Sequence, residues 1–282
     1  MGEDQMNRTV RTRAVAVLAG ATLLVGGLAA CEGATKTDAA KGAADGAGAA
    51  PGAPTRGSSP VEAVKASWLK TVKAKFAMAE ISATDRDGKT TTQTGTKGWY
   101  PSAHDLTIKG PDSESRSVMT GDVVYTQLKT PVDGKPWMKL DLAAGGAPAP
   151  RMNEDPAEYL ALLLGQPKVA LVPATATDAP GTRHYRALLT GADLQAADES
   201  TKVMPEKDRR YLRESVKHLT ALEADVWIGK DDYPARVVTV SHDDKGASST
   251  KATFDGFGQV APVTAPPADQ VADFDAVLQG GS

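Results

Sequence analysis

The sequence predicts an α+β fold in which most of the chain forms one antiparallel sheet. Short runs with strand character follow one another over residues 95–142, and tight-turn pairs such as Gly110-Pro111 and Asp133-Gly134 separate them. Short strands with brief turns favour an antiparallel meander over parallel βαβ units. A few stretches with helical spacing of apolar residues supply the helices.

The first helix is expected to begin after Ser59-Pro60, a pair typical of a helix start. The apolar residues that recur there at helical spacing are Val61, Val64, Trp68, Val72 and Phe76. The end of this helix is open, because Phe76–Ile81 can equally begin a strand. Asp87-Gly88 then marks a tight turn between two threonine-rich arms.

The strands expected next are residues 95–100, 105–109, 114–119, 122–129 and 137–142. Side chains alternate between the two faces of a strand, so Val124 and Thr126 share one face and Val123 and Tyr125 share the other. The alternation does not say which of these faces is concave.

A second helix is expected from Asp155-Pro156-Ala157-Glu158. Asp155 can cap it, Pro156 suits the first helical position, and Glu158 can bond back to the cap. The following Tyr159–Leu164 is apolar nearly all round and is stopped by Gly165. A helix without a polar face is buried, or it covers an apolar cavity.

The remaining elements follow the same reasoning. Strands are expected at 168–174 and 183–190, a charged helix at 205–219, a hairpin of 224–228 with 235–241, a strand at 249–257 and a short closing helix at 269–278.

The N-terminus reads as a bacterial leader that ends at the only cysteine of the chain. Arg8, Arg11 and Arg13 precede an apolar run, 14–30, that closes with Leu28-Ala29-Ala30-Cys31. This tetrapeptide resembles the lipobox of bacterial lipoproteins. We therefore expect a signal peptide at 1–30 and lipidation of Cys31.

Covalent diacylglycerol and acyl groups of the palmitate type on Cys31 would hold the protein at the outer face of the cell membrane. The alternative is an uncleaved membrane anchor, since the 17 residues of the run reach the lower limit for spanning a bilayer. Translation can start at Met1 or at Met6.

Between leader and fold, residues 31–60 are predicted to be a disordered tether. Of the 29 residues from Glu32 to Pro60, 18 are Ala, Gly or Pro and none is a large apolar residue. Such a segment cannot bury enough surface to offset its ordering entropy. A glycosylated stalk or cell-wall spacer is the alternative. Residues 61–282 then form a single domain.

The order of these signals resembles the LppX/LprG-type lipoproteins of actinobacteria, which are related in fold to the Lol-type lipoprotein carriers. The resemblance is carried by Gly121–Tyr125, Gly134–Asp141, Asp225–Pro234 and Phe254–Gly258, the last followed by Ala265-Pro266-Pro267. It implies a strongly curved half-barrel sheet with helices on its concave side, and non-covalent binding and transfer of a lipid or acylated glycolipid in an apolar cavity, without catalysis.

Candidate residues for lining such a cavity are large apolar side chains on the expected strands and on the second helix. They are Trp99, Met119, Tyr125, Trp137, Leu160, Leu163, Leu164 and Trp227. The alternative is that these side chains fill the interior. In that case the chain is a non-enzymatic lipoprotein that docks a protein partner of the envelope or acts as a sensor.

Other chemistries find little support in the sequence. The four histidines lack metal-ligand spacing, and no nucleophile-elbow, zinc-protease or P-loop motif occurs. A secreted hydrolase would need a triad assembled from distant residues. The mildly acidic chain has no basic block, so no nucleic-acid partner is expected. No metal or cofactor is expected.

Overall fold

The computed structural model describes residues 59–143, 154–164, 166, 168–197 and 199–273. Every described residue lies in one compact unit, Ala49–Ser282. The predicted signal peptide, Cys31 and the tether up to residue 58 lie outside the described residues.

The first helix, α1 (Pro60–Ala74), begins with a reciprocal cap. The Ser59 hydroxyl accepts a hydrogen bond from the Glu62 N–H, and the Glu62 carboxylate accepts one from the Ser59 N–H. Lys75 follows the helix with a φ of +65° and turns the chain into a strand. The ambiguous stretch Phe76–Ile81 therefore belongs to β1 (Phe76–Thr84).

The predicted meander is present. It consists of β2 (Thr90–Gly98), β3 (Ala103–Lys109), β4 (Glu114–Thr120), β5 (Val123–Val132) and β6 (Lys135–Asp141). Each strand pairs antiparallel with the next from β1 to β6.

The second half of the described chain begins with helix α2 and forms another meander. Its elements are α2 (Pro156–Leu163), β7 (Ala170–Val172), β8 (Arg183–Thr190), α3 (Gly191–Ala196), η1 (Ser200–Val203), α4 (Glu206–Val216), β9 (Ala221–Ile228), β10 (Pro234–Asp243) and β11 (Gly246–Asp255). The short elements α3 and η1 are not among the sequence predictions.

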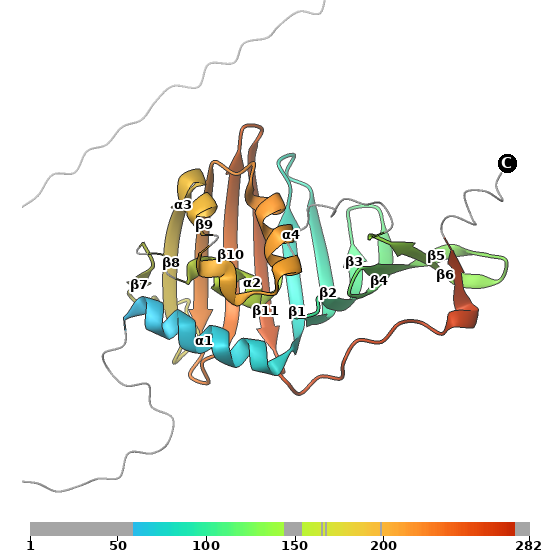
Figure 1. Ribbon diagram of the computed structural model, residues 1–282, viewed down its shortest axis with the longest axis horizontal. Coiled ribbons are helices and arrows are strands. Elements are labelled where there is room, and N and C mark those ends of the chain that lie inside the picture. Colours follow the sequence, from blue (N-terminus) through green and yellow to red (C-terminus); the bar gives the residue numbers. More distant parts are fainter. Residues whose placement is uncertain (1–58, 144–153, 165, 167, 198, 274–282) are drawn as a thin grey trace, which may run out of the picture. The chain divides into compact units, whose positions relative to one another are not determined.

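The two meanders join into one twelve-stranded sheet with the order β12-β6-β5-β4-β3-β2-β1-β11-β10-β9-β8-β7. The joint is the antiparallel pair β1–β11, which runs from Met78 opposite Asp255 to Thr84 opposite Ser249. The sheet is open and curved, and α1 to α4 lie on one face of it (Figure 1). The predicted α+β fold with helices on the concave side of a curved antiparallel sheet is confirmed.

The predicted closing helix is wrong in its described part. Residues Ala268–Gln270 form only the 3-10 turn η2, and Val271–Asp273 form β12, which pairs parallel with β6. Residues 274–278 of that prediction lie outside the described residues. This short tail pairs with β6, and the sequence of the tail alone does not reveal that partner.

Candidate functional site

The concave face of the sheet is lined by aliphatic and small side chains around β1 and β8–β11. One row across these strands consists of Ile81, Ala252, Val237, Val226 and Tyr185, and all five are buried. The neighbouring row carries Thr239, Ala224 and Ala187, which are also buried. Because these side chains are short, the sheet surface is shallow there and a helix can approach it closely.

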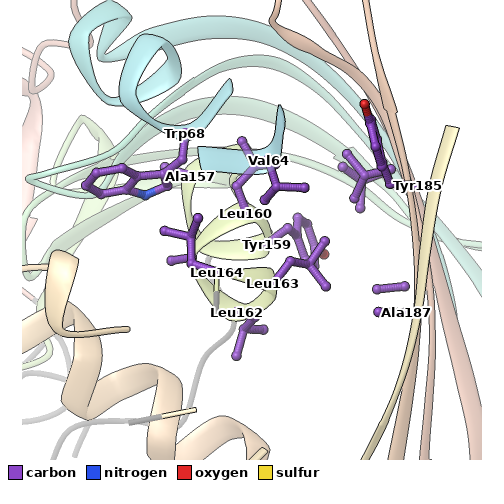
Figure 2. Packing of buried hydrophobic residues seen from close by; sticks show 14 of the residues in the cluster. Val64, Trp68, Ala157, Tyr159, Leu160, Leu162, Leu163, Leu164, Tyr185 and Ala187 are labelled. Atoms are coloured by element: carbon purple, nitrogen blue, oxygen red, sulfur yellow. The ribbon is translucent and has the colours of Figure 1, made fainter. Parts of the chain in front are cut away.

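Helix α2 occupies this shallow region. All eight of its residues are buried, so the helix has no solvent-facing side, as its apolar sequence predicts. It packs against α1, η1 and β10. Tyr159 and Leu163 point towards the strand that carries Tyr185 and Ala187 (Figure 2).

Two polar links hold α2 in place. The side chain of Asp155 accepts a hydrogen bond of 2.8 Å from the Glu158 N–H, which is the predicted cap. On the side towards the sheet, the Tyr159 hydroxyl is hydrogen-bonded to Thr239, and burial raises the pKa of Tyr159 well above its usual range. Both links lie at the first turn of the helix.

The first turn of α2 carries carboxyl groups into the interior. Asp155 is 1% exposed, and burial raises its pKa to about 6, with a further rise from Asp208 on α4. The Glu158 N–H and Lys97 of β2 act in the opposite direction. The sequence predicts Asp155 as a cap, but it contains no signal that the cap is buried.

Four of the predicted lining residues lie together in the core. Trp99, Leu160, Leu163 and Leu164 belong to one buried cluster. Trp99 is 1% exposed, and its indole N–H donates a hydrogen bond of 2.9 Å to the Thr71 carbonyl of α1. Trp99, which directly follows β2, therefore joins the sheet to α1.

Met119 of β4 is buried and lies on the same face of the sheet as the core. Its register neighbours are His104 on β3 and Val124 on β5, so it lies in the β3–β6 part of the sheet. It is not part of the core cluster that surrounds α2.

The other three predicted residues lie on the opposite face. Tyr125 and Trp137 alternate with the residues of β5 and β6 that continue the concave face, and the Arg116 guanidinium lies 5.6 Å from the Trp137 ring centre. The neighbour of Trp227 on β9, Val226, faces the core, so Trp227 faces outwards. These three side chains do not line the space between helices and sheet.

Trp227 has a packing role on its own face. Its ring stacks on His184 at 4.0 Å and lies under the Arg236 guanidinium at 4.4 Å. The indole N–H donates to Asp178 at 2.6 Å. The aromatic side chain is thus enclosed by polar groups of the outer face.

Two open cavities lie away from α2. One of about 250 Å³ is lined by Thr107, Glu114, Ser115, Arg116, Gln127, Leu128 and Lys129. The other, of about 510 Å³, is lined by Pro180, Thr182, Gly229, Lys230 and Asp231. The first is bordered largely by polar residues, whereas the second exposes more apolar than polar surface.

The histidines on the strands have separate partners. His104 contacts Ser117, His184 contacts Asp225 and His242 contacts Glu223. Over the described ranges, no three His, Cys, Asp or Glu side chains are arranged to hold a metal ion. In the same ranges no helix combines the length and apolar character needed to cross a bilayer.

Comparison with known proteins found no matching family model and no matching curated protein. Among solved structures, the chain is similar to the Mycobacterium tuberculosis lipoprotein LppX, with 16% identity, a TM-score of 0.42 and coverage of 72% of this chain and 99% of LppX. The resemblance stated from the sequence is confirmed.

Two further solved structures are similar. LprF from Mycobacterium bovis has 13% identity and a TM-score of 0.43, covering 74% of this chain and 96% of LprF. An uncharacterized conserved protein from Thermus thermophilus has 11% identity and a TM-score of 0.39, covering 76% of this chain and 99% of that one. The function proposed below rests on the residues of this chain.

Proposed function

We propose that this chain is an extracytoplasmic lipoprotein, anchored through a lipidated Cys31, that binds and transfers a lipid or acylated glycolipid without catalysing a reaction. The supporting observation is α2, a short, fully buried helix that is apolar apart from Glu158 and the Tyr159 hydroxyl and that lies on the concave face of a curved sheet. An acyl chain can occupy the same place, because removing its apolar surface from water is as favourable as removing that of the α2 side chains.

In this proposal the cargo takes the place of α2 on the concave face. The core around α2 is packed in the described structure, so the helix must move when cargo enters. The alanines of the concave face leave room for a chain of methylenes once the larger side chains Leu160 and Leu163 have left. Trp99, which lies outside α2, would border the acyl chain.

The test uses protein purified from membranes of a cell that processes the leader. We expect mass spectrometry to find co-purified lipid, and a fluorescent fatty acyl probe to bind saturably. Lipid addition should speed amide exchange in α2 (Pro156–Leu163) and leave β9 (Ala221–Ile228) unchanged. Absence of both co-purified lipid and probe uptake would refute lipid binding.

A second function is favoured by the packed state of the core itself. If α2 never leaves, the same fold acts as an envelope protein that docks another protein or senses a signal. The discriminating result is amide exchange in α2 that does not respond to lipid, together with a stoichiometric protein partner retained by the full chain.

A further inference from the structure

The side of α1 that faces the core carries polar atoms without partners. Ser67 and Thr71 are fully buried and Trp68 is 8% exposed. The Ser67 hydroxyl, the Trp68 indole N–H and the Thr71 hydroxyl have no hydrogen-bond partner among the described residues. Buried polar groups are nearly always paired, so three on neighbouring turns of one helix require an explanation.

A fourth such atom comes from the turn after β2. Tyr100 has a φ of +53°, and its buried hydroxyl also lacks a partner within the described chain. This hydroxyl neighbours the Trp68 indole, although the two do not meet hydrogen-bond geometry. The turn thus adds a second donor beside Trp68.

The apolar part of α2 cannot satisfy these donors, although Asp155 and Glu158 at its first turn lie close enough to Tyr100 to raise the pKa of that residue. Trp68 belongs to the same buried cluster as Ala157 and Leu160 of α2, the helix that packs against α1 (Figure 2). Apolar side chains offer neither donor nor acceptor, and an unmade buried hydrogen bond is costly. The surface of α1 is therefore better matched to something other than the helix that covers it here.

The charge around the donors restricts what can bind there. Burial raises the pKa of Tyr100, and the carboxylates of Asp155, Glu158 and Asp208 raise it further; of these three, Asp208 on α4 stays in place when α2 is displaced. A negative field that opposes ionisation of the Tyr100 hydroxyl also opposes an incoming phosphate or free carboxylate. An uncharged acceptor does not meet this repulsion.

We propose that Trp68 and Tyr100, together with Ser67 and Thr71, form a subsite for the ester carbonyl oxygens of a neutral acyl lipid such as an acylglycerol or acylated sugar. This inference rests on the proposed function, in which cargo displaces α2. An indole N–H can only donate, and an ester carbonyl can only accept. The acyl chain then lies on the concave face of the sheet while its ester end faces α1.

The test compares two lipids that differ only in their carbonyl groups. A short-chain diacylglycerol and the matching dialkylglycerol ether compete with a fluorescent acyl probe for the full chain. We expect the ester to bind about tenfold more tightly than the ether, as one or two net hydrogen bonds imply. Equal affinity would overturn the subsite while leaving lipid binding intact, whereas binding of neither lipid refutes both.

Trp68→Phe is the decisive variant, because phenylalanine keeps an aromatic ring against α2 and removes only the N–H. We expect the preference for ester over ether to fall to roughly threefold or less, with unchanged affinity for the ether. Trp227→Phe, on the outer face, is the matched control and should keep the full preference. If Trp68→Phe lowers the affinity for the ester and for the ether by the same factor, Trp68 has only a structural role.

A third ligand tests the charge argument. Phosphatidic acid with the same acyl chains adds an anionic phosphate to the diacylglycerol. It is expected to bind more weakly than the neutral diacylglycerol, because of the negative field at Tyr100. Tighter binding of the phosphatidic acid would contradict a subsite for neutral esters.

Discussion

At the residue scale, Asp155 shows how a correct local prediction can miss the environment. Its position before Pro156 identifies a helix cap, and the cap is formed. Besides burial, its pKa responds to charges far away in sequence: Lys97 of β2 lowers it and Asp208 of α4 raises it. A capping residue is ordinarily exposed, so only the fold makes this one sensitive to pH.

The first prediction concerns Asp155→Asn. The pKa of Asp155 in the folded protein, about 6, lies above the value near 3.9 of an unfolded chain, so protonation favours folding. This contribution is full below pH ~4 and is lost as pH rises through about 6, at a cost of up to about 3 kcal/mol. Asparagine caps equally well, so the variant should gain stability over the wild type between pH 5 and 7.5 in denaturant titrations.

Asp193→Asn is the matched control. Hydrogen bonds from Lys168 and Thr190 lower the pKa of Asp193 to about 2. Its contribution to stability is present above pH ~4 and is lost only as pH falls through about 2. The difference between this variant and the wild type should therefore stay constant from pH 5 to 7.5. A constant difference for Asp155→Asn as well would contradict a titrating buried cap.

Alternation along a strand is predictable, but the choice of face is not. The sequence separates Val124 from Tyr125, and the structure keeps them on opposite faces. Trp137 and Trp227 are as apolar as Trp99, yet they lie on the outer face, where arginine side chains cover them. Arg116 and Arg236 belong to other strands, so the sequence around each tryptophan does not reveal its cover.

At the element scale, α2 is the helix that the sequence predicts best and that matters most to the proposed function. Its cap, its proline and its apolar run all agree on one helix. α3 and η1 escape prediction because six and four residues are too few to show a period of 3.6.

The second prediction tests how firmly α2 is packed. Leu160 is fully buried, so Leu160→Ala should lower the free energy of unfolding by about 2–5 kcal/mol, through lost burial and the cavity left behind. Leu188, which is 55% exposed on β8, provides the control, and Leu188→Ala should change stability by less than about 0.5 kcal/mol. Similar small effects at both positions would mean that α2 is not part of the cooperative core.

The third prediction concerns the close approach of β2 and β3. A Cβ at Gly95 would lie 2.1 Å from the Asp105 carbonyl oxygen, and the φ of Gly95 is +148°. Gly95→Ala must therefore separate the two strands, and we expect a loss of at least about 2 kcal/mol by thermal or chemical unfolding.

Gly88→Ala serves as the comparison for Gly95→Ala. Gly88 also has a positive φ, +78°, but a Cβ there meets no atom within 4 Å. The expected cost is about 1 kcal/mol, from backbone strain alone. If the two variants lose the same stability, the close contact at Gly95 has no energetic weight.

At the scale of the whole molecule, the sequence predicts the class of fold and the order of its elements. The meander, the final hairpin and the two main helices follow from local patterns. The joining of the two meanders through β1 and β11 does not, because no local pattern links residues 78–84 to residues 249–255. The resemblance to a known family implies one curved sheet around helices, but it does not specify this pair of strands.

The fourth prediction concerns the anchor of the whole protein. Cys31→Ser should abolish lipidation, so the variant is expected to leave the membrane fraction and become soluble after cell fractionation. A serine has the same size but cannot form the thioether. Firm retention of the variant in the membrane fraction would favour the uncleaved anchor at residues 14–30 instead.

The β1–β11 pair also bears on how the protein is made. Synthesis delivers a chain from its N-terminus, so β1 emerges long before β11 exists. During that interval a strand destined for the middle of the sheet has a bare hydrogen-bonding edge, which favours aggregation. Chains terminated before Asp255 should therefore depend on chaperones.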